Sequence, residues 1–174
     1  MTLGTKTLLF GVHQVIIHPL LVTISWIRLY HSFPNWKELF CIFIHDWGYW
    51  GKPNLKNADG DTHPQLGANI AEKLLGSEWR DFILGHSSFY VVRNNIKASK
   101  LLAPDKYFHC LIPLWAYKIL AVPTGEFRHY RDIKHCRQVA DQSETDKEWY
   151  DKLRKVCMNK INNQYIIDIE RLSQ

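Results

Sequence analysis

The sequence has few cysteines, and their spacing is not that of a paired motif. The four cysteines at positions 41, 110, 136 and 157 form no CxxC pair. The amino terminus also lacks the basic run and the small-residue cleavage site of a signal peptide. Together these absences predict reduced thiols and a cytoplasmic protein.

The chain also lacks an uninterrupted apolar run long enough to cross a membrane. Its most hydrophobic stretch, residues 8–27, contains His13, Gln14, His18 and Pro19. These residues are costly in a bilayer, where no water is present to satisfy their polar groups. We therefore expect this stretch to belong to a protein core, and we expect no membrane partner.

Strict two-residue alternation of apolar and polar side chains is nearly absent, whereas many segments place apolar residues three and four apart. This pattern predicts an all-α protein. With 174 residues and 46% hydrophobic content, the chain is long enough for one domain with a sizeable core. We expect a single domain, residues 1–174, with a functional core over about 13–122 and further helices over 124–174.

The formal net charge of +5 fits an anionic small molecule, nucleic acid or an acidic surface. No helix-turn-helix, zinc finger or basic tract is present, so the sequence does not predict sequence-specific binding of nucleic acid. The last helix packs either on its own domain or on a second copy of the chain. The second case would give a homo-oligomer, and the sequence does not decide between the two.

Helix start and stop signals divide the chain into segments. Pro19 and Pro64 suit first helical positions, Asn35 precedes an apolar run, and Ser77, Thr124 and Ser143 are good caps. Residues 52–62 and 93–95 are polar and predict loops. Pro104 and Pro113 predict a kink or break in the apolar segment 99–122. The helices are expected at residues 19–30, 35–46, 64–75, 77–84, 99–122, 124–139 and from 143 onward.

Metal-ligand side chains occur once or twice in each of five successive segments. Alone, each histidine is more simply explained as a packed core residue. Taken together, they suggest a metal site, because metal sites inside helical bundles are built from facing helices that each contribute one or two such side chains. The candidates are His18, the adjacent pair His45 and Asp46, His63, His86 and Asp105.

This ordered set resembles the HD-domain superfamily of metal-dependent phosphohydrolases, whose name-giving doublet stands here as His45 and Asp46. The resemblance covers about residues 18–106. It implies an HD-domain helical bundle in which His18, His45, Asp46 and Asp105 hold one ion. Family members with two ions place two more histidines between the doublet and the last aspartate, where His63 and His86 stand here.

The resemblance thus implies two divalent transition-metal ions, chosen from Mn, Fe, Co, Ni and Zn, with Asp46 as a bridge. Two closely spaced ions can activate water and polarise a phosphoryl oxygen. The expected activity is hydrolysis of a phosphoester or phosphoanhydride bond in a small anionic substrate, with a nucleotide as the first candidate.

Several other residues are candidates for contact with that substrate. Lys106 directly follows Asp105, in a place where family members often carry a basic residue, and it would steady negative charge that develops during the reaction. Arg93, Ser87 and Glu126 complete the expected substrate contacts. The simpler alternatives are that Ser87 terminates a helix and that Glu126 is an ordinary helix-start carboxylate.

One departure from the family pattern keeps other functions open. Several nucleotidase branches place an acidic residue a few positions after the doublet, but here Trp47, Gly48, Tyr49 and Trp50 follow Asp46. A minority of six-ligand HD proteins use two irons to activate oxygen, and their ligand order is the same. A third possibility is a non-catalytic protein that binds and sequesters a nucleotide.

Overall fold

A computed structural model describes residues 1–55, 57–132 and 145–172 of the chain. The described residues are helical or in turns and contain no β-strand, which confirms the all-α prediction for them. The elements are α1 (Leu3–Phe10), α2 (Ile17–Tyr30), α3 (Trp36–Ile44), the 3₁₀ turn η1 (Trp47–Tyr49), α4 (Asn57–Gly60), α5 (Pro64–Leu75), α6 (Ser77–Leu84), α7 (Ser88–Asn94), α8 (Leu102–Leu111), α9 (Leu114–Thr124), α10 (Glu126–Asp132) and α12 (Asp146–Leu172).

Local capping signals explain why several of these helices begin where predicted. Asn35 caps α3 in a full capping box with Glu38, so two otherwise unpaired backbone donors are satisfied. Pro64 occupies the first position of α5, where the missing N–H costs nothing. Thr145 and Glu148 form the same reciprocal pair at the start of α12.

Other boundaries differ from the prediction. Helix α2 begins at Ile17, so Pro19 lies within its first turn rather than opening it. Ser77 is the first residue of α6, and Gly76 is the N-cap. Part of the polar stretch 52–62 forms the single turn α4. Arg93, expected in a loop, lies in the last turn of α7.

The apolar segment 99–122 is broken into two helices, as its prolines predicted. Pro113 is the N-cap of α9, whereas Pro104 lies in the first turn of α8 and leaves that helix intact. Thr124 is the last residue of α9, and its hydroxyl oxygen also accepts from the backbone N–H of Glu126, the first residue of α10. Gly125 lies between them with φ of 85°, a value that favours glycine. Residues 133–139 of the expected helix, Ser143 and Cys136 lie outside the described residues.

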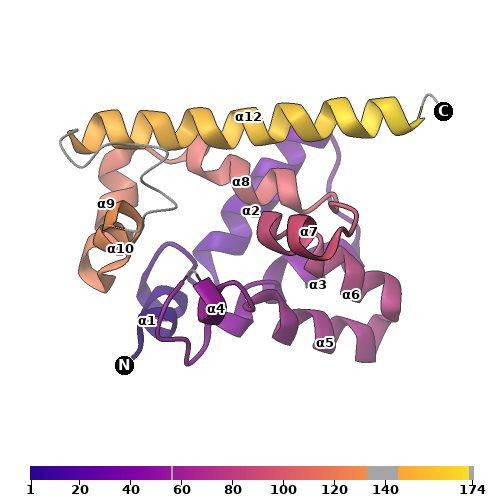
Figure 1. Ribbon diagram of the computed structural model, residues 1–174, viewed down its shortest axis with the longest axis horizontal. Helices are drawn as coiled ribbons and strands as arrows, with labels where there is room; N and C mark the ends of the chain where they lie inside the picture. The colour runs from indigo at the N-terminus through magenta and orange to yellow at the C-terminus, as the bar shows by residue number, and fades with distance from the viewer. Residues whose placement is uncertain (56, 133–144, 173–174) are drawn as a thin grey trace.

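The helices pack in layers. In Figure 1, α12 runs along one side of the molecule with α8 beneath it, and α2 packs against the other side of α8. Helices α5 and α6 form a second packed pair near α3. One aromatic core lies under α12, around Tyr117, Trp149 and Tyr150, and a second core of smaller side chains joins α3, α5 and α6. None of the helices in the described part of the chain is long and apolar enough to cross a membrane.

Candidate metal centre

All six predicted ligand residues lie at or near helix ends that converge. His18 is in the first turn of α2 and Asp105 in the first turn of α8. His45 and Asp46 follow the end of α3, and His63 is the N-cap of α5. His86 comes two residues after the end of α6. Gly67 lets α5 approach this point closely, because a Cβ atom there would stand 2.4 Å from the carbonyl oxygen of Ile44.

Four of these residues form a first group of buried ligand atoms: His18, His45, Asp46 and Asp105. The Nε2 atom of His18 lies 3.2 Å from Nε2 of His45, 3.3 Å from Oδ2 of Asp46 and 3.2 Å from Oδ1 of Asp105. The Nε2 atom of His45 lies 3.3 Å from Oδ2 of Asp46 and 3.6 Å from Oδ1 of Asp105. Four donor atoms therefore surround one small volume.

The second group consists of Asp46, His63 and His86. The two imidazoles face each other with their Nε2 atoms 3.3 Å apart. Oδ1 of Asp46 lies 3.4 Å from Nε2 of His63 and 3.6 Å from Nε2 of His86. Asp46 thus turns one carboxylate oxygen toward each group, which is the arrangement of a carboxylate that bridges two ions.

The distances fit divalent transition metals. Nitrogen and oxygen ligands lie about 2.0–2.2 Å from such an ion, so neighbouring ligand atoms stand roughly 2.8–3.6 Å apart in octahedral or tetrahedral coordination. The distances given above for the two groups, 3.2–3.6 Å, lie within this range. In addition, Oδ2 of Asp46 is buried and accepts no hydrogen bond among the described residues. A buried carboxylate oxygen left without a donor is costly unless a cation meets it.

Backbone carbonyl groups orient three of the four histidines. The Nδ1 atom of His45 lies 2.6 Å from the oxygen of Ile42, that of His63 lies 2.8 Å from the oxygen of Gly60, and that of His86 lies 2.5 Å from the oxygen of Ile83. A carbonyl oxygen only accepts, so each Nδ1 carries the proton and donates. Each Nε2 then offers its lone pair to the centre, as in protein metal sites with an oriented histidine.

The electrostatics of the centre favour added positive charge. Burial alone would raise the pKa of Asp46, but the charge of His45 and the nearby imidazoles of His18 and His86 hold it well below its usual range. Burial also opposes protonation of His45, yet the carboxylates of Asp46 and Asp105 raise its pKa to about 10. Burial lowers the pKa of His63 and of His86. A metal ion would supply this positive charge at His45 in place of the proton, so that the imidazole binds in its neutral form. Two carboxylates and neutral imidazoles are a donor set suited to divalent transition metals.

The side chains of the centre differ in their exposure to solvent. Those of His18, His45 and His86 are at most 1% exposed, whereas His63 is 11% and Lys106 is 27% exposed. Nζ of Lys106 donates to Oδ2 of Asp105 over 2.6 Å, whereas Oδ1 of the same carboxylate faces His18 and His45. We refer to the exposed part of the centre, with His63 and Lys106, as its open side.

The remaining predicted substrate contacts occupy different environments. Arg93 is exposed on α7, with its guanidinium 5.5 Å from the ring of Phe89. Ser87 is buried, and its hydroxyl oxygen accepts from the backbone N–H of Tyr90 to cap α7. Glu126 is fully buried at the start of α10. Among the described residues, no hydrogen bond or ion pair joins the side chain of Arg93 or Ser87 to a ligand atom of the two groups.

Glu126 belongs to a polar cluster that sequence reasoning missed. Its carboxylate lies 2.7 Å from Nδ1 of His13 and accepts from the hydroxyl of Thr7 over 2.7 Å and from the backbone N–H of Val12 over 3.0 Å. The ring of His13 in turn lies 5.3 Å from that of His18, between ring centroids. His13 therefore lies between a buried carboxylate and the ring of His18 in the first group.

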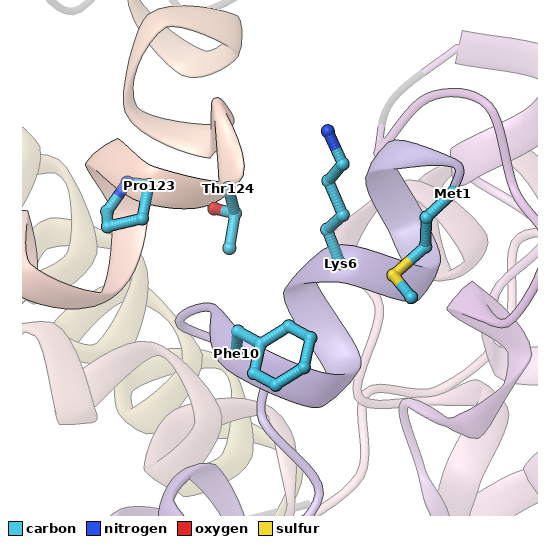
Figure 2. A pocket seen from close by; sticks show the side chains of 5 residues that line it. All are labelled: Met1, Lys6, Phe10, Pro123 and Thr124. Carbon is cyan, nitrogen blue, oxygen red and sulfur yellow. The ribbon is translucent and has the colours of Figure 1, made fainter.

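A separate cavity lies between α1 and α9, with a volume of about 250 Å³. Figure 2 shows the side chains around it: Met1, Lys6, Phe10, Pro123 and Thr124. None of these residues belongs to either ligand group. The cavity is thus distinct from the metal centre.

Comparison of the chain with protein-family models, with curated proteins and with solved structures finds no match. The convergence of the six ligand residues thus rests on the geometry of this chain alone.

Proposed function

We propose that the protein is an HD-domain phosphohydrolase that hydrolyses a phosphoester or phosphoanhydride bond of a small anionic substrate, with a nucleotide as the first candidate. The observation that carries the proposal is the position of Asp46, whose two oxygens face two separate groups of buried ligand atoms. A carboxylate in this position fixes the spacing of two ions. Two such ions, when bound, activate water and polarise a phosphoryl oxygen.

The chain's own residues divide the work. His18, His45 and Asp105 would hold the first ion, and His63 and His86 the second, with Asp46 shared between them. Lys106 reaches the open side and would bind phosphate oxygens and steady their growing negative charge. Arg93 and Ser87 are proposed as more distant contacts of the substrate. The net charge of +5 would help to attract an anion.

Glu126 takes a different proposed role, because its carboxylate is fully buried. We place it behind His13, where it accepts the Nδ1 proton and fixes the ring. In this arrangement Glu126 acts on the centre through His13 and not by contact with the substrate. The pair would support the closed side of the metal centre.

The test begins with the purified protein and elemental analysis of its bound metals. A panel of nucleotides and other phosphate esters is then screened for released phosphate, with and without added Mn²⁺ or Co²⁺. We expect two ions per chain and metal-dependent phosphate release. Asp46→Ala should abolish release, and Asp81→Ala, which removes an exposed carboxylate on α6, should not.

The same preparation separates the alternatives. Oxygen consumption by an iron-loaded sample, without phosphate release, would identify the di-iron oxygenase. Tight nucleotide binding without any product would identify a sequestering protein. Unchanged phosphate release by Asp46→Ala would remove the proposed mechanism.

A further inference from the structure

The turn η1 follows Asp46 directly and occupies the place where related nucleotidases carry an acidic residue. It contains Trp47, Gly48 and Tyr49, and it packs against α5 and α1. The proposed hydrolysis gives these residues no role. Their contacts nevertheless converge on one ligand of the second group, His63.

Tyr49 lies flat against the imidazole of His63. The two ring centroids are 4.2 Å apart and the planes differ by 6°. Tyr49 is only 4% exposed and packs with Leu8 and Leu55 in a small core of its own. A ring anchored in this way limits the rotation of the imidazole that stacks on it.

Gly48 packs closely against the backbone of His63, the residue on which Tyr49 stacks. A Cβ atom at position 48 would stand 1.9 Å from the carbonyl oxygen of His63, far inside van der Waals contact. Any residue other than glycine would push His63 away from its present position. The hydrogen bond between Nδ1 of His63 and the carbonyl oxygen of Gly60 completes the support.

His63 needs this support more than the other ligands do. It is the most exposed of the six ligand residues. Its group also has three protein ligands, against four in the first group. A misplaced ligand therefore removes a larger share of the protein–metal contacts in the second group than it would in the first.

We propose that Gly48 and Tyr49 are positioning residues for His63 and thereby set the affinity of the second ion, while the first ion is independent of them. This inference rests on the proposed binuclear centre. According to this inference, the turn η1 supports metal binding and does not supply a catalytic acid or base.

The test counts ions directly. Metal-free protein is titrated with Mn²⁺, free Mn²⁺ is followed by electron paramagnetic resonance, and two dissociation constants are fitted. Tyr49→Leu should weaken the second site about 10- to 100-fold, the usual cost of lost outer support, and leave the first unchanged. Tyr49→Phe keeps the stacked ring and should bind like the wild type. Trp50→Leu, in the adjacent exposed position, is the matched control.

Gly48→Ala provides a second variant that leaves the Tyr49 ring and its small core untouched. It should also lose the second ion selectively, with unchanged helical circular dichroism. Unaltered second-site affinity in both Tyr49→Leu and Gly48→Ala would overturn the inference. Loss of helical signal in both would also overturn it, since the turn would then serve the fold and not one ligand. If the wild type itself binds fewer than two ions, the binuclear centre fails before the question of positioning arises.

Discussion

The two halves of the candidate metal centre are built by different means. The first group draws buried side chains from α2 and α8 and from the end of α3, and its histidines are fully enclosed. The second group shares Asp46 but takes His63 and His86 from residues that flank helices. The first half is thus the closed half, whereas the second, which we call the open half, has one ligand fewer and contains the most exposed ligand residue, His63, at 11%. We infer that the closed half retains its ion and the open half exchanges ions and meets the substrate.

The largest expected effect comes from removing one ligand on each side. His18→Ala should reduce phosphate release about a thousandfold or more, which corresponds to roughly 4 kcal/mol of transition-state stabilisation. His63→Ala should leave one ion per chain and reduce release about a hundredfold. Elemental analysis and steady-state kinetics measure both, with His31→Asn as the control because His31 is exposed at φ of 52° and asparagine tolerates that backbone. Equal ion counts in the two variants would contradict the proposed difference in ion binding between the two halves.

The six candidate ligand residues were predictable because their order along the chain resembles that of the HD-domain superfamily, and because the local sequence marks the start of two of the helices beside them. Asn35 and Glu38 fix α3 and therefore the position of His45, and Pro64 fixes α5 just after His63. What remained hidden depends on partners far away along the chain. The hydroxyl of Thr7 and the carboxylate of Glu126 are 119 positions apart, so no local pattern could assign His13 between them.

The missed helices have a common physical reason. Helix α1 buries Gly4, Thr5 and Thr7 together with a single leucine, Leu8, so it shows no apolar stripe to detect. Helix α7 buries none of its side chains, and its polar end was taken for a loop. The stacking of Tyr49 on His63 was equally invisible, since it depends on a tertiary contact between two turns.

A second prediction concerns the support behind the closed half. Glu126→Gln removes the charge that pairs with His13 inside the protein, and loss of one partner of a buried pair costs roughly 3 kcal/mol of unfolding free energy. Burial opposes ionisation of both groups. Nevertheless, His13 and hydrogen bonds lower the pKa of Glu126, and Glu126 raises the pKa of His13.

The two pKa shifts determine how the difference in unfolding free energy between wild type and Glu126→Gln depends on pH. The carboxylate contributes stability above its ordinary pKa of 4.5 and loses it as the pH falls through the lowered value. The imidazole contributes fully below its ordinary pKa of 6.5 and loses this as the pH rises through the raised value. Urea unfolding in the presence of a chelator should therefore show the largest gap between wild type and Glu126→Gln at about pH 4.5–6.5. A gap that does not vary with pH would contradict the ion pair.

Metal removal is the third test, and it should act on the two halves in sequence. A weak chelator should withdraw the ion of the open half first, and a strong one both. An ion present at 100 times its dissociation constant stabilises the folded state by about 2.7 kcal/mol. For a chain of this size, loss of that energy lowers the melting temperature by about 5–10 °C. Differential scanning calorimetry and elemental analysis at each chelator concentration would show two steps, whereas simultaneous loss of both ions would argue for a single cooperative site.

The smallest predicted effect separates substrate binding from metal binding on the open side. Lys106 donates to Oδ2 of Asp105, while Oδ1 of the same carboxylate faces the first group. Lys106→Gln should therefore leave both ions in place but lower kcat/KM about tenfold, equal to roughly 1.4 kcal/mol. Lys147→Gln on α12, where the lysine is largely exposed, controls for the lost charge. A drop in ion count in Lys106→Gln would mean that the lysine maintains the carboxylate as a ligand. Lys106 would then belong with the closed half of the centre, and the open half would have to draw its phosphate contacts from α7.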